Sequence, residues 1–181
     1  MESADRTKKN IVELTRCTAA EYRAMKKLPL IVVVDNVRSM HNVGSLFRTS
    51  DAFRVSRLIL GGISGCPPHA EISKTALGAE ESVAWEHTDD VLACVEQLQS
   101  DGWTICVLEQ THGSIPLQTY AAPDEHKLVL VVGNEVKGVD QRIVDIADHV
   151  LEIPQEGTKH SLNVAASGAI ALFHLYLLLS T

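Results

Sequence analysis

The fold is decided by residues 30–53, which read LIVVVDNVRSMHNVGSLFRTSDAF. The first five residues are aliphatic without a polar interruption, which is typical of a strand buried on both faces in a parallel sheet. From Asn42 to Phe53 the apolar residues recur at helical spacing, so we expect a helix there. A buried strand that leads into a helix is the repeating unit of an open α/β sheet.

The same alternation continues to the end of the chain. Strands are expected at residues 57–60, 103–108, 127–132 and 149–153. Helices are expected between Asp89 and Gly102, from Asp140, and from Ser161 onward. The pattern predicts an open, mostly parallel sheet flanked by helices in residues 28–181, after a basic N-terminal extension at residues 1–27. Thr18 and Glu21 of the extension have the spacing of a capping box.

Composition and charge allow several kinds of partner. The chain has 181 residues, 45% of them hydrophobic, enough for a sizeable core. Its net charge of −7 argues against a nucleic-acid partner. However, residues 1–27 carry seven basic and four acidic side chains, so the charge neither requires nor excludes RNA. The aromatic share of 4% argues against a binding mode built on many stacked aromatic rings.

The four cysteines, Cys17, Cys66, Cys94 and Cys106, are widely spaced and form no C-x-x-C pair. We therefore expect buried small hydrophobic residues, no metal site and a reducing compartment, with the cytoplasm as the default. The apolar run at 169–179 is shorter than the ~20 residues of a membrane span and contains His174. A helix in a core or a subunit interface is expected there, and no membrane partner.

Common nucleotide and hydrolase sites are excluded by their missing motifs. No G-x-G-x-x-G follows the first strand, which argues against a dinucleotide site. Gly133 and Gly138 have P-loop spacing, but Val139 and Asp140 stand where Lys and Ser or Thr are needed. The chain also lacks G-x-S-x-G and H-E-x-x-H.

Chemistry is expected in three polar turns that follow strands, because ligands of open α/β sheets bind beyond the carboxyl ends of the strands. The turns lie at residues 35–48, 133–138 and 154–163. His41 and His160 lie in two of them, and we expect both to be local hydrogen-bonding residues. Asn42, Ser45 and Arg48 cluster near a helix N-terminus, which with a guanidinium suits a phosphate or an oxyanion.

Three segments carry a resemblance to a known family. Asn42, Gly44 and Arg48 match its N-x-G-x-x-x-R motif; residues 133–139, GNEVKGV, resemble its G-[NS]-E-x-x-G-[VIL] turn; and residues 153–165, IPQEGTKHSLNVA, resemble its I-P-…-S-L-N-V segment. In this order, over residues 30–180, the chain resembles the TrmH (SpoU) family of the SPOUT superfamily. The resemblance implies an S-adenosylmethionine-dependent RNA ribose 2′-O-methyltransferase, a homodimer and a C-terminal trefoil knot. A knot runs against the general rules of folds and rests on the resemblance alone.

The resemblance also implies roles for individual residues. The family's arginine that matches Arg48 acts on the 2′-OH, yet a guanidinium stays protonated, so Arg48 is either an unusual base helped by a phosphate or a cation that stabilises the alkoxide. The predicted catalytic residues are Asn42, Arg48, Glu135, Ser161 and Asn163. The predicted cofactor-binding residues are Leu108, Glu109, Gly133, Asn134, Ile153, Pro154, Ser161 and Leu162. The predicted RNA-binding residues are Lys8, Lys9, Arg38, Arg48 and Lys159.

The RNA substrate stays open between two classes. The basic residues 1–27 resemble the short extension of single-domain tRNA enzymes, which favours tRNA over ribosomal RNA. A non-catalytic RNA-binding homologue is the main alternative from another class, and methylation of a small molecule is a third.

Overall fold

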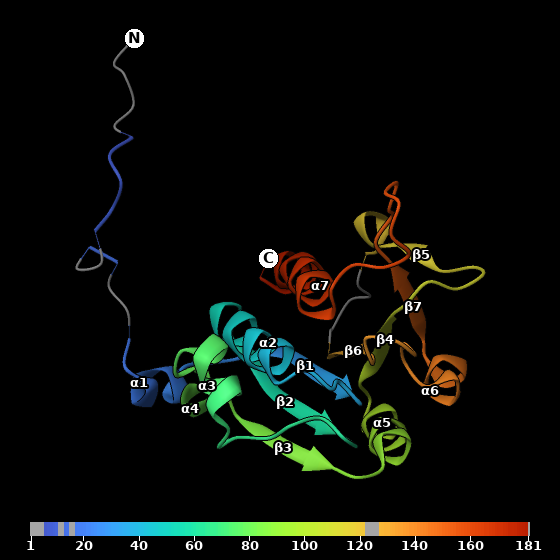
Figure 1. Ribbon diagram of the computed structural model, residues 1–181, viewed down its shortest axis with the longest axis horizontal. Helices are drawn as coiled ribbons and strands as arrows, with labels where there is room; N and C mark the ends of the chain where they lie inside the picture. The colour runs from blue at the N-terminus through green and yellow to red at the C-terminus, as the bar shows by residue number, and fades with distance from the viewer. Residues whose placement is uncertain (1–5, 11–12, 15–16, 122–126, 181) are drawn as a thin grey trace.

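The computed structural model describes residues 6–10, 13–14, 17–121 and 127–180 (Figure 1). The rest of the predicted extension, at 1–5, 11–12 and 15–16, lies outside the described residues. Seven strands form one sheet in the order β3-β2-β1-β6-β4-β7-β5, and every neighbouring pair is parallel. This confirms the predicted open α/β sheet. The strands are β1 (Leu28–Asp35), β2 (Val55–Gly61), β3 (Trp85–Thr88), β4 (Thr104–Leu108), β5 (Ile115–Pro116), β6 (Leu128–Val132) and β7 (His149–Glu152).

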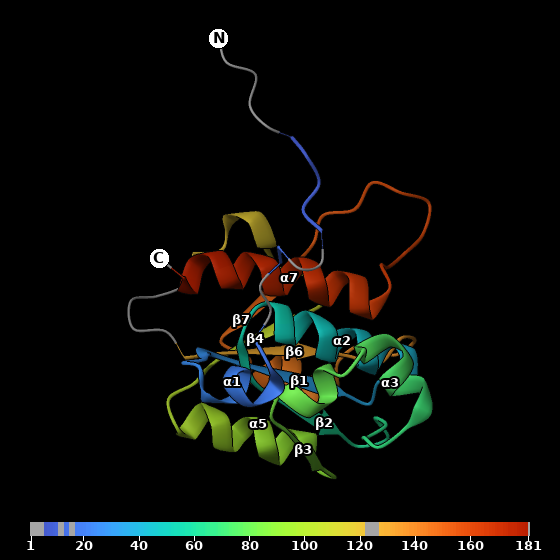
Figure 2. The ribbon, with the colours of Figure 1, turned by 90° about the vertical axis from the view of Figure 1, so that its left-hand side faces the viewer.

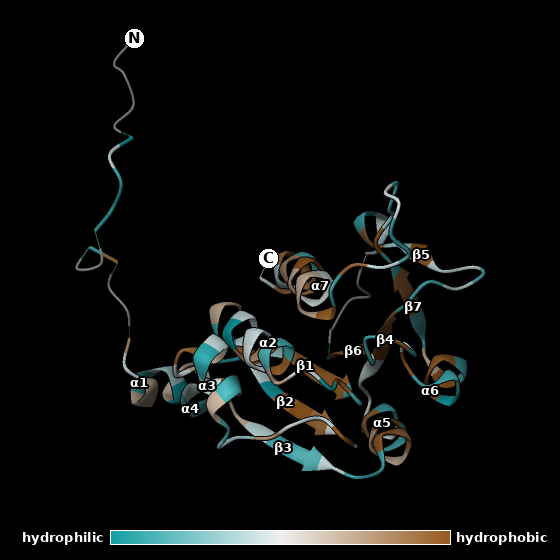
Figure 3. Cartoon of the chain, viewed as in Figure 1, coloured by the Kyte–Doolittle hydropathy of each residue, from teal (hydrophilic) through white to brown (hydrophobic). Residues whose placement is uncertain are grey.

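Helices cover both faces of the sheet, as Figure 1 shows. Successive residues of β1 alternate between two hydrophobic cores: Leu30, Val32 and Val34 face one, and Ile31 and Val33 face the other. This double burial explains why the strand has no polar alternation and is predominantly brown, the hydrophobic colour, in Figure 3. The first core contains residues of α1 (Ala19–Ala24), α2 (Met40–Ala52), α3 (Ala70–Ala76), α4 (Ala79–Ser82), η1 (Leu117–Thr119) and α7 (Val164–Leu179), and the second contains residues of α5 (Val91–Ser100) and α6 (Gln141–Ile146).

Helices α2 and α7 pack side by side and run in the same direction (Figure 2). At the C-terminal ends, the Phe53 ring lies 5.8 Å from that of Phe173 and 5.3 Å from that of Tyr176. Midway, a Cβ on Gly168 would lie 2.9 Å from a methyl carbon of Leu46, so glycine permits the close approach. Within the described residues, no helix has the length and apolar character needed to cross a membrane.

The N-terminal helix α1 is docked on this body. Thr18 and Glu21 form the predicted capping box, which is confirmed. Tyr22 is buried, and its hydroxyl donates a hydrogen bond of 2.9 Å to the carbonyl of Asp51 at the end of α2. Part of the predicted extension therefore contributes to the first core, and the boundary at residues 27 and 28 stays a prediction.

The structure corrects two details. Cys17 is exposed and Cys66 and Cys94 are half-buried, so the prediction of buried cysteines is wrong except for Cys106. Cys17 lies directly before Thr18, the exposed cap of α1. The last helix begins at Val164, three residues after the expected start at Ser161, because Asn163 caps it.

Candidate active site

The turns after β1 and β6 are joined by one carboxylate. Glu135, in the turn after β6, accepts hydrogen bonds of 3.0 Å from the backbone N–H groups of Arg38 and Ser39. Its Oε1 also accepts one of 3.0 Å from Nδ2 of Asn42 in the first turn of α2. The side chain of Glu135 thereby sets the position of the helix start that follows β1.

The hydrogen bonds decide the charge of Glu135. Burial raises the pKa of this carboxyl, but the backbone N–H groups of Arg38, of Glu135 itself and of Ser39, together with the Asn42 amide, lower it by more. The pKa of Glu135 therefore lies below its ordinary value, and the group is ionised at neutral pH. Such a carboxylate orients donors and is a poor general base.

Asn42 links this carboxylate to the last helix. Because its Nδ2 donates to Glu135, its Oδ1 is left to accept, and Nδ2 of Asn163 donates to it at 3.0 Å. Oδ1 of Asn163 in turn accepts from the N–H groups of Ala165 and Ala166 and caps α7. The structure thus brings Glu135, Asn42 and Asn163 into one continuous chain of hydrogen bonds.

The turn that carries Glu135 is closed by its own backbone. Asn134 and Gly138 exchange two backbone hydrogen bonds of 3.0 Å, and the Asn134 side chain donates one of 2.7 Å to the carbonyl of Asn36. A Cβ on Gly133 would lie 2.3 Å from backbone atoms of Gly138 and of Val139. Glycine at 133 is therefore required for the turn to fold back over the end of β6.

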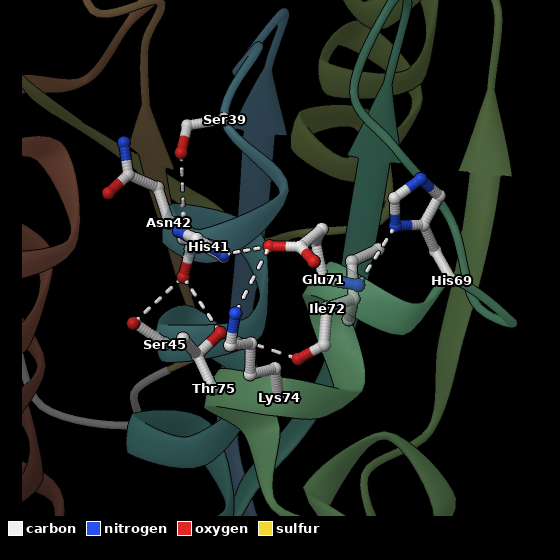
Figure 4. Close-up of polar contacts among 9 residues, drawn as sticks. All are labelled: Ser39, His41, Asn42, Ser45, His69, Glu71, Ile72, Lys74 and Thr75. Atoms are coloured by element: carbon white, nitrogen blue, oxygen red, sulfur yellow. Dashed lines mark hydrogen bonds and ion pairs between the residues drawn. The ribbon is translucent and has the colours of Figure 1, made fainter.

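Helix α3 holds the first turn of α2 through His41 (Figure 4). The ring of His41 contacts the Glu71 carboxylate through Nε2, and the hydroxyls of Thr75 and Ser45 donate to the His41 carbonyl at 3.0 and 2.8 Å. The His41 ring, followed by Lys74, keeps the pKa of Glu71 below its ordinary value. In Figure 4 the Asn42 side chain points away from this cluster.

Gly44 makes this contact between helices possible. A Cβ at this position would lie 2.1 Å from Oγ1 of Thr75 and 2.3 Å from the carbonyl oxygen of Ile72. Any larger side chain would push α2 away from α3 and would displace Asn42, two residues earlier. The glycine of the N-x-G motif therefore has a packing role in this structure.

A cavity of about 480 Å³ lies beside the Glu135 turn, between the segments that follow β4, β6 and β7. This volume is within the range of small-molecule sites. Of the predicted cofactor-binding residues, Pro154 is not in its lining, although the flanking Ile153 and Gln155 are. The other seven line the cavity: Leu108, Glu109, Gly133, Asn134, Ile153, Ser161 and Leu162.

The comparison with known families agrees with this geometry. The model of the SpoU rRNA methylase family matches residues 29–173. The chain belongs to this family. The predicted family resemblance is thereby confirmed, and the matched segment contains all three turns described above.

Several SpoU-family relatives have named activities. The chain is 31% identical over 151 residues to the 23S rRNA (guanosine-2′-O-)-methyltransferase RlmB of Vibrio parahaemolyticus, which covers 83% of this chain and 60% of the relative. It is 30% identical over 146 residues to a tRNA (guanosine(18)-2′-O)-methyltransferase of Mus musculus, covering 80% of this chain and 9% of the relative. The chain thus spans about 60% of the length of the bacterial relative that it matches.

Two solved structures have the same fold. A TrmH/SpoU tRNA modifying enzyme of A. aeolicus superposes with a TM-score of 0.78 at 28% identity, covering 88% of this chain and 81% of that one. An AdoMet-bound rRNA methyltransferase of Sinorhizobium meliloti superposes with a TM-score of 0.76 at 26% identity, covering 84% of this chain and 58% of that one.

Arg48, a predicted catalytic residue, lies outside the hydrogen-bonded chain. Its side chain is exposed on α2, and among the described residues it makes no hydrogen bond or ion pair. The Asp51 carboxylate, a possible partner on the same helix, accepts instead from the hydroxyl of Ser82. The guanidinium of Arg48 is therefore available to an external group.

The predicted RNA-binding residues come from separate segments of the chain. Lys8 and Lys9 are exposed on a segment that extends away from the sheet (Figure 1). Lys159 is exposed on the 154–163 loop, and Arg38 is exposed on the turn after β1.

Gln110 was expected to contact the cofactor through its backbone, together with Leu108 and Glu109. Gln110 lines the cavity, and its side chain donates a hydrogen bond of 3.0 Å from Nε2 to the carbonyl of His160, which ties the turn after β4 to the 154–163 loop. Glu71 and Thr75, which hold the first turn of α2, were not predicted from the sequence, because they lie on α3, a helix that was not predicted.

Proposed function

We propose that the chain is an S-adenosylmethionine-dependent methyltransferase that transfers a methyl group to a ribose 2′-OH in structured RNA. The observation that carries this proposal is the chain of hydrogen bonds from Glu135 through Asn42 to Asn163 at the edge of a ligand-sized cavity. The named activities of the relatives support the same reaction. A non-catalytic RNA-binding protein has no need of an ionised carboxylate and two amides aligned beside such a cavity.

The lining of the cavity fits S-adenosylmethionine. Leu108, Ile153 and Leu162 offer aliphatic surface to an adenine ring, and the turns supply polar backbone groups. The turn at 133–139 packs closely against Glu109, because a Cβ on Gly138 would lie 2.1 Å from a carboxylate oxygen of Glu109. The cofactor, when bound, supplies a methyl group on a positively charged sulfonium.

The residues of the chain itself position the cofactor and the RNA. Glu135 is ionised and accepts three hydrogen bonds from its neighbours, so we assign it a positioning role. It fixes the direction of the Asn42 amide, which in turn fixes Asn163 at the start of α7. Ser161, two residues before Asn163, lines the cavity and is suited to hydrogen-bond the cofactor or the RNA.

Arg48 is the remaining candidate for the chemistry at the hydroxyl. Its exposed guanidinium has no partner among the described residues, so an RNA phosphate or a developing alkoxide can bind to it. Both versions, a base helped by phosphate and a stabilising cation, require its two-pronged donor geometry.

Two RNA classes remain as substrates. tRNA is favoured by the basic residues 1–27. Ribosomal RNA is the second candidate, because the bacterial relative that aligns with 83% of this chain is named as a 23S rRNA methyltransferase. Loss of activity towards only one RNA class on replacement of the exposed Lys8 and Lys9 with glutamine, which leaves α1 in place, would assign the role of this segment.

A homodimer through α7 belongs to the same proposal. Ile170, Phe173 and Leu177 are exposed large apolar residues at helical spacing on α7. Such a stripe, unusual on a monomer, suits a second copy of the chain.

The C-terminal knot and a cytoplasmic location complete the proposal. β6 pairs with both β1 and β4, and α7 returns across the sheet to pack on α2, an arrangement compatible with a threaded chain. Four free thiols are compatible with a reducing compartment.

Cofactor binding is the first test. Calorimetric titration with S-adenosylmethionine should give saturable binding. Gly133→Val, whose Cβ would lie 2.3 Å from the backbone of Gly138 and of Val139, should abolish the binding, whereas Gly157→Val, in open space on the 154–163 loop, should not. Absence of binding by the unmodified chain at high ligand concentration would contradict the proposal and favour a non-catalytic protein.

A further inference from the structure

A second hollow, of about 820 Å³, shares the 134–139 turn as a wall with the cofactor cavity. It opens beyond the carboxyl ends of β1 and β2, where the turn after β1 supplies Arg38 and the turn after β2 supplies Ile63. The shared turn supplies Val136 and Lys137. None of the steps proposed above uses this hollow.

The wall after β2 holds an aliphatic side chain in solvent. Ile63 is 64% exposed, although its N–H donates a hydrogen bond of 3.2 Å to Oδ1 of Asn36. The next residue, Ser64, is buried and fixed at both ends: its hydroxyl donates to the carbonyl of Val34 at 3.1 Å and accepts from the N–H of Val37 at 2.9 Å. The exposure of Ile63 is therefore imposed by a well-anchored turn.

The opposite wall also exposes an aliphatic side chain to solvent: Val136 is 81% exposed. Its N–H donates to Oδ1 of Asn134 at 2.9 Å, inside the turn that Asn134 and Gly138 close by two backbone hydrogen bonds. Two anchored turns thus present exposed aliphatic side chains to one hollow. Burial of each against a ligand would be favourable by the hydrophobic effect.

The charge available at the hollow is positive. Arg38 and Lys137 are exposed, and their side chains have no hydrogen bond or ion pair among the residues that the structure describes. The two carboxylates of the lining are already satisfied, since Asp35 accepts from the Asn36 amide and from the N–H of Asp140, and Asp140 pairs with Arg142. An anionic ligand therefore meets two unpaired cations.

We propose that this hollow is a subsite for one unpaired nucleotide that neighbours the methylated ribose. Its base packs between Ile63 and Val136, and its phosphates bind Arg38 and Lys137. Proteins recognise single-stranded RNA segments by binding the accessible faces of unpaired bases. The combination of apolar contact with phosphate-binding cations therefore fits a nucleotide better than a protein surface. The inference rests on the proposed function, because the shared turn carries Glu135.

The first experiment measures methyl transfer from labelled S-adenosylmethionine to bulk tRNA and bulk ribosomal RNA from a strain that lacks the protein. The variant Ile63→Thr changes a residue that lines this hollow and not the cofactor cavity, and Leu77→Ser, at an equally exposed leucine outside both hollows, is the control. The Ile63→Thr variant should raise the KM for RNA about threefold, with the Kd for S-adenosylmethionine and kcat unchanged. A KM equal to that of the control would overturn the subsite.

Salt dependence tests the cations separately. Arg38→Gln and Lys137→Gln should each reduce the slope of log affinity against log salt by about 0.7, as for one single-stranded phosphate contact. Slopes identical to that of the unmodified chain would contradict the assignment of phosphate to this rim.

Cross-linking gives a readout that does not depend on a stability change. A photoreactive benzoylphenylalanine at position 63 should cross-link to the accepting RNA pool in the presence of S-adenosylhomocysteine, and the same group at position 77 should not. Methylation by the unmodified chain without a cross-link from position 63, or with one only to protein, would overturn the subsite alone. Absence of methyl transfer by the unmodified chain would overturn the proposed function and the subsite with it.

Discussion

Replacing Glu135 with glutamine removes a charge without removing atoms from the site. Oε2 of Glu135 accepts from Arg38, and Oε1 accepts from Ser39 and Asn42, each at 3.0 Å. Whichever way the glutamine amide is turned, its NH₂ group faces at least one of these donors. A hydrogen bond to a charged group contributes about 1.5–3 kcal/mol, and partial exposure of Glu135 to solvent favours the lower end, about 1.5 kcal/mol.

The loss should depend on pH in a defined direction. Because the pKa of Glu135 is depressed in the folded protein, its stabilising contribution is fully present above the unfolded value of about 4.3 and is lost as the pH falls through the folded value. The difference in unfolding free energy between Glu135 and Glu135→Gln should therefore be constant from pH 8 to about pH 5 and shrink below about pH 4.

Urea unfolding followed by circular dichroism at several pH values measures this difference. The control is Glu96→Gln, an exposed α5 carboxylate with no partner among the described residues, and its effect should stay within ~0.5 kcal/mol. Methyl transfer at neutral pH should fall about tenfold in Glu135→Gln if the lost energy positions the reacting groups. A difference in stability that is equal at pH 7 and at pH 3, or absent at pH 7, would refute the reasoning.

Three further changes test separate parts of the account. Gly44→Ala should destabilise the fold by about 1–3 kcal/mol in urea unfolding, because its Cβ would overlap Thr75 and the Ile72 carbonyl; an unchanged midpoint would contradict the packing role. Arg48→Lys should lower kcat at least ~10-fold and leave the Kd for S-adenosylmethionine unchanged, because lysine lacks the forked donor; near-normal turnover would exclude both versions of its role. Phe173→Glu should convert the proposed dimer to a monomer in sedimentation equilibrium, and a persistent dimer would place the interface elsewhere.

The sequence predicts the buried strands and long helices, because their patterns are local. Residues 30–34 and 128–132 are aliphatic throughout and form the two central strands β1 and β6. The short polar strand β3, Trp85–Thr88, was not predicted, since its half-exposed edge position leaves no hydrophobic run and its order comes from pairing with β2. Helix α3, of seven residues, was missed for a similar reason.

The sequence predicted which residues belong to the site, but it did not predict how they are arranged. The motifs gave Asn42, Glu135 and Asn163, but the hydrogen bonds that join them span 93 and 121 residues, a separation that no local pattern encodes. The packing of α3 against Gly44 could not be predicted from the sequence either. A glycine indicates close packing, but it does not identify the helix that packs against it. The hollow beside Ile63 depends on two turns that only the folded chain brings together.

The central claim is that this chain methylates a ribose 2′-OH in RNA. The most direct measurement incubates it with labelled S-adenosylmethionine and RNA from a strain lacking the protein, digests the RNA to nucleosides and maps the label. The account predicts a single 2′-O-methylated nucleoside at a defined position, formed by the unmodified chain and strongly reduced in Asn42→Ala. Label on a base, label on small molecules only, or full activity in Asn42→Ala would contradict it.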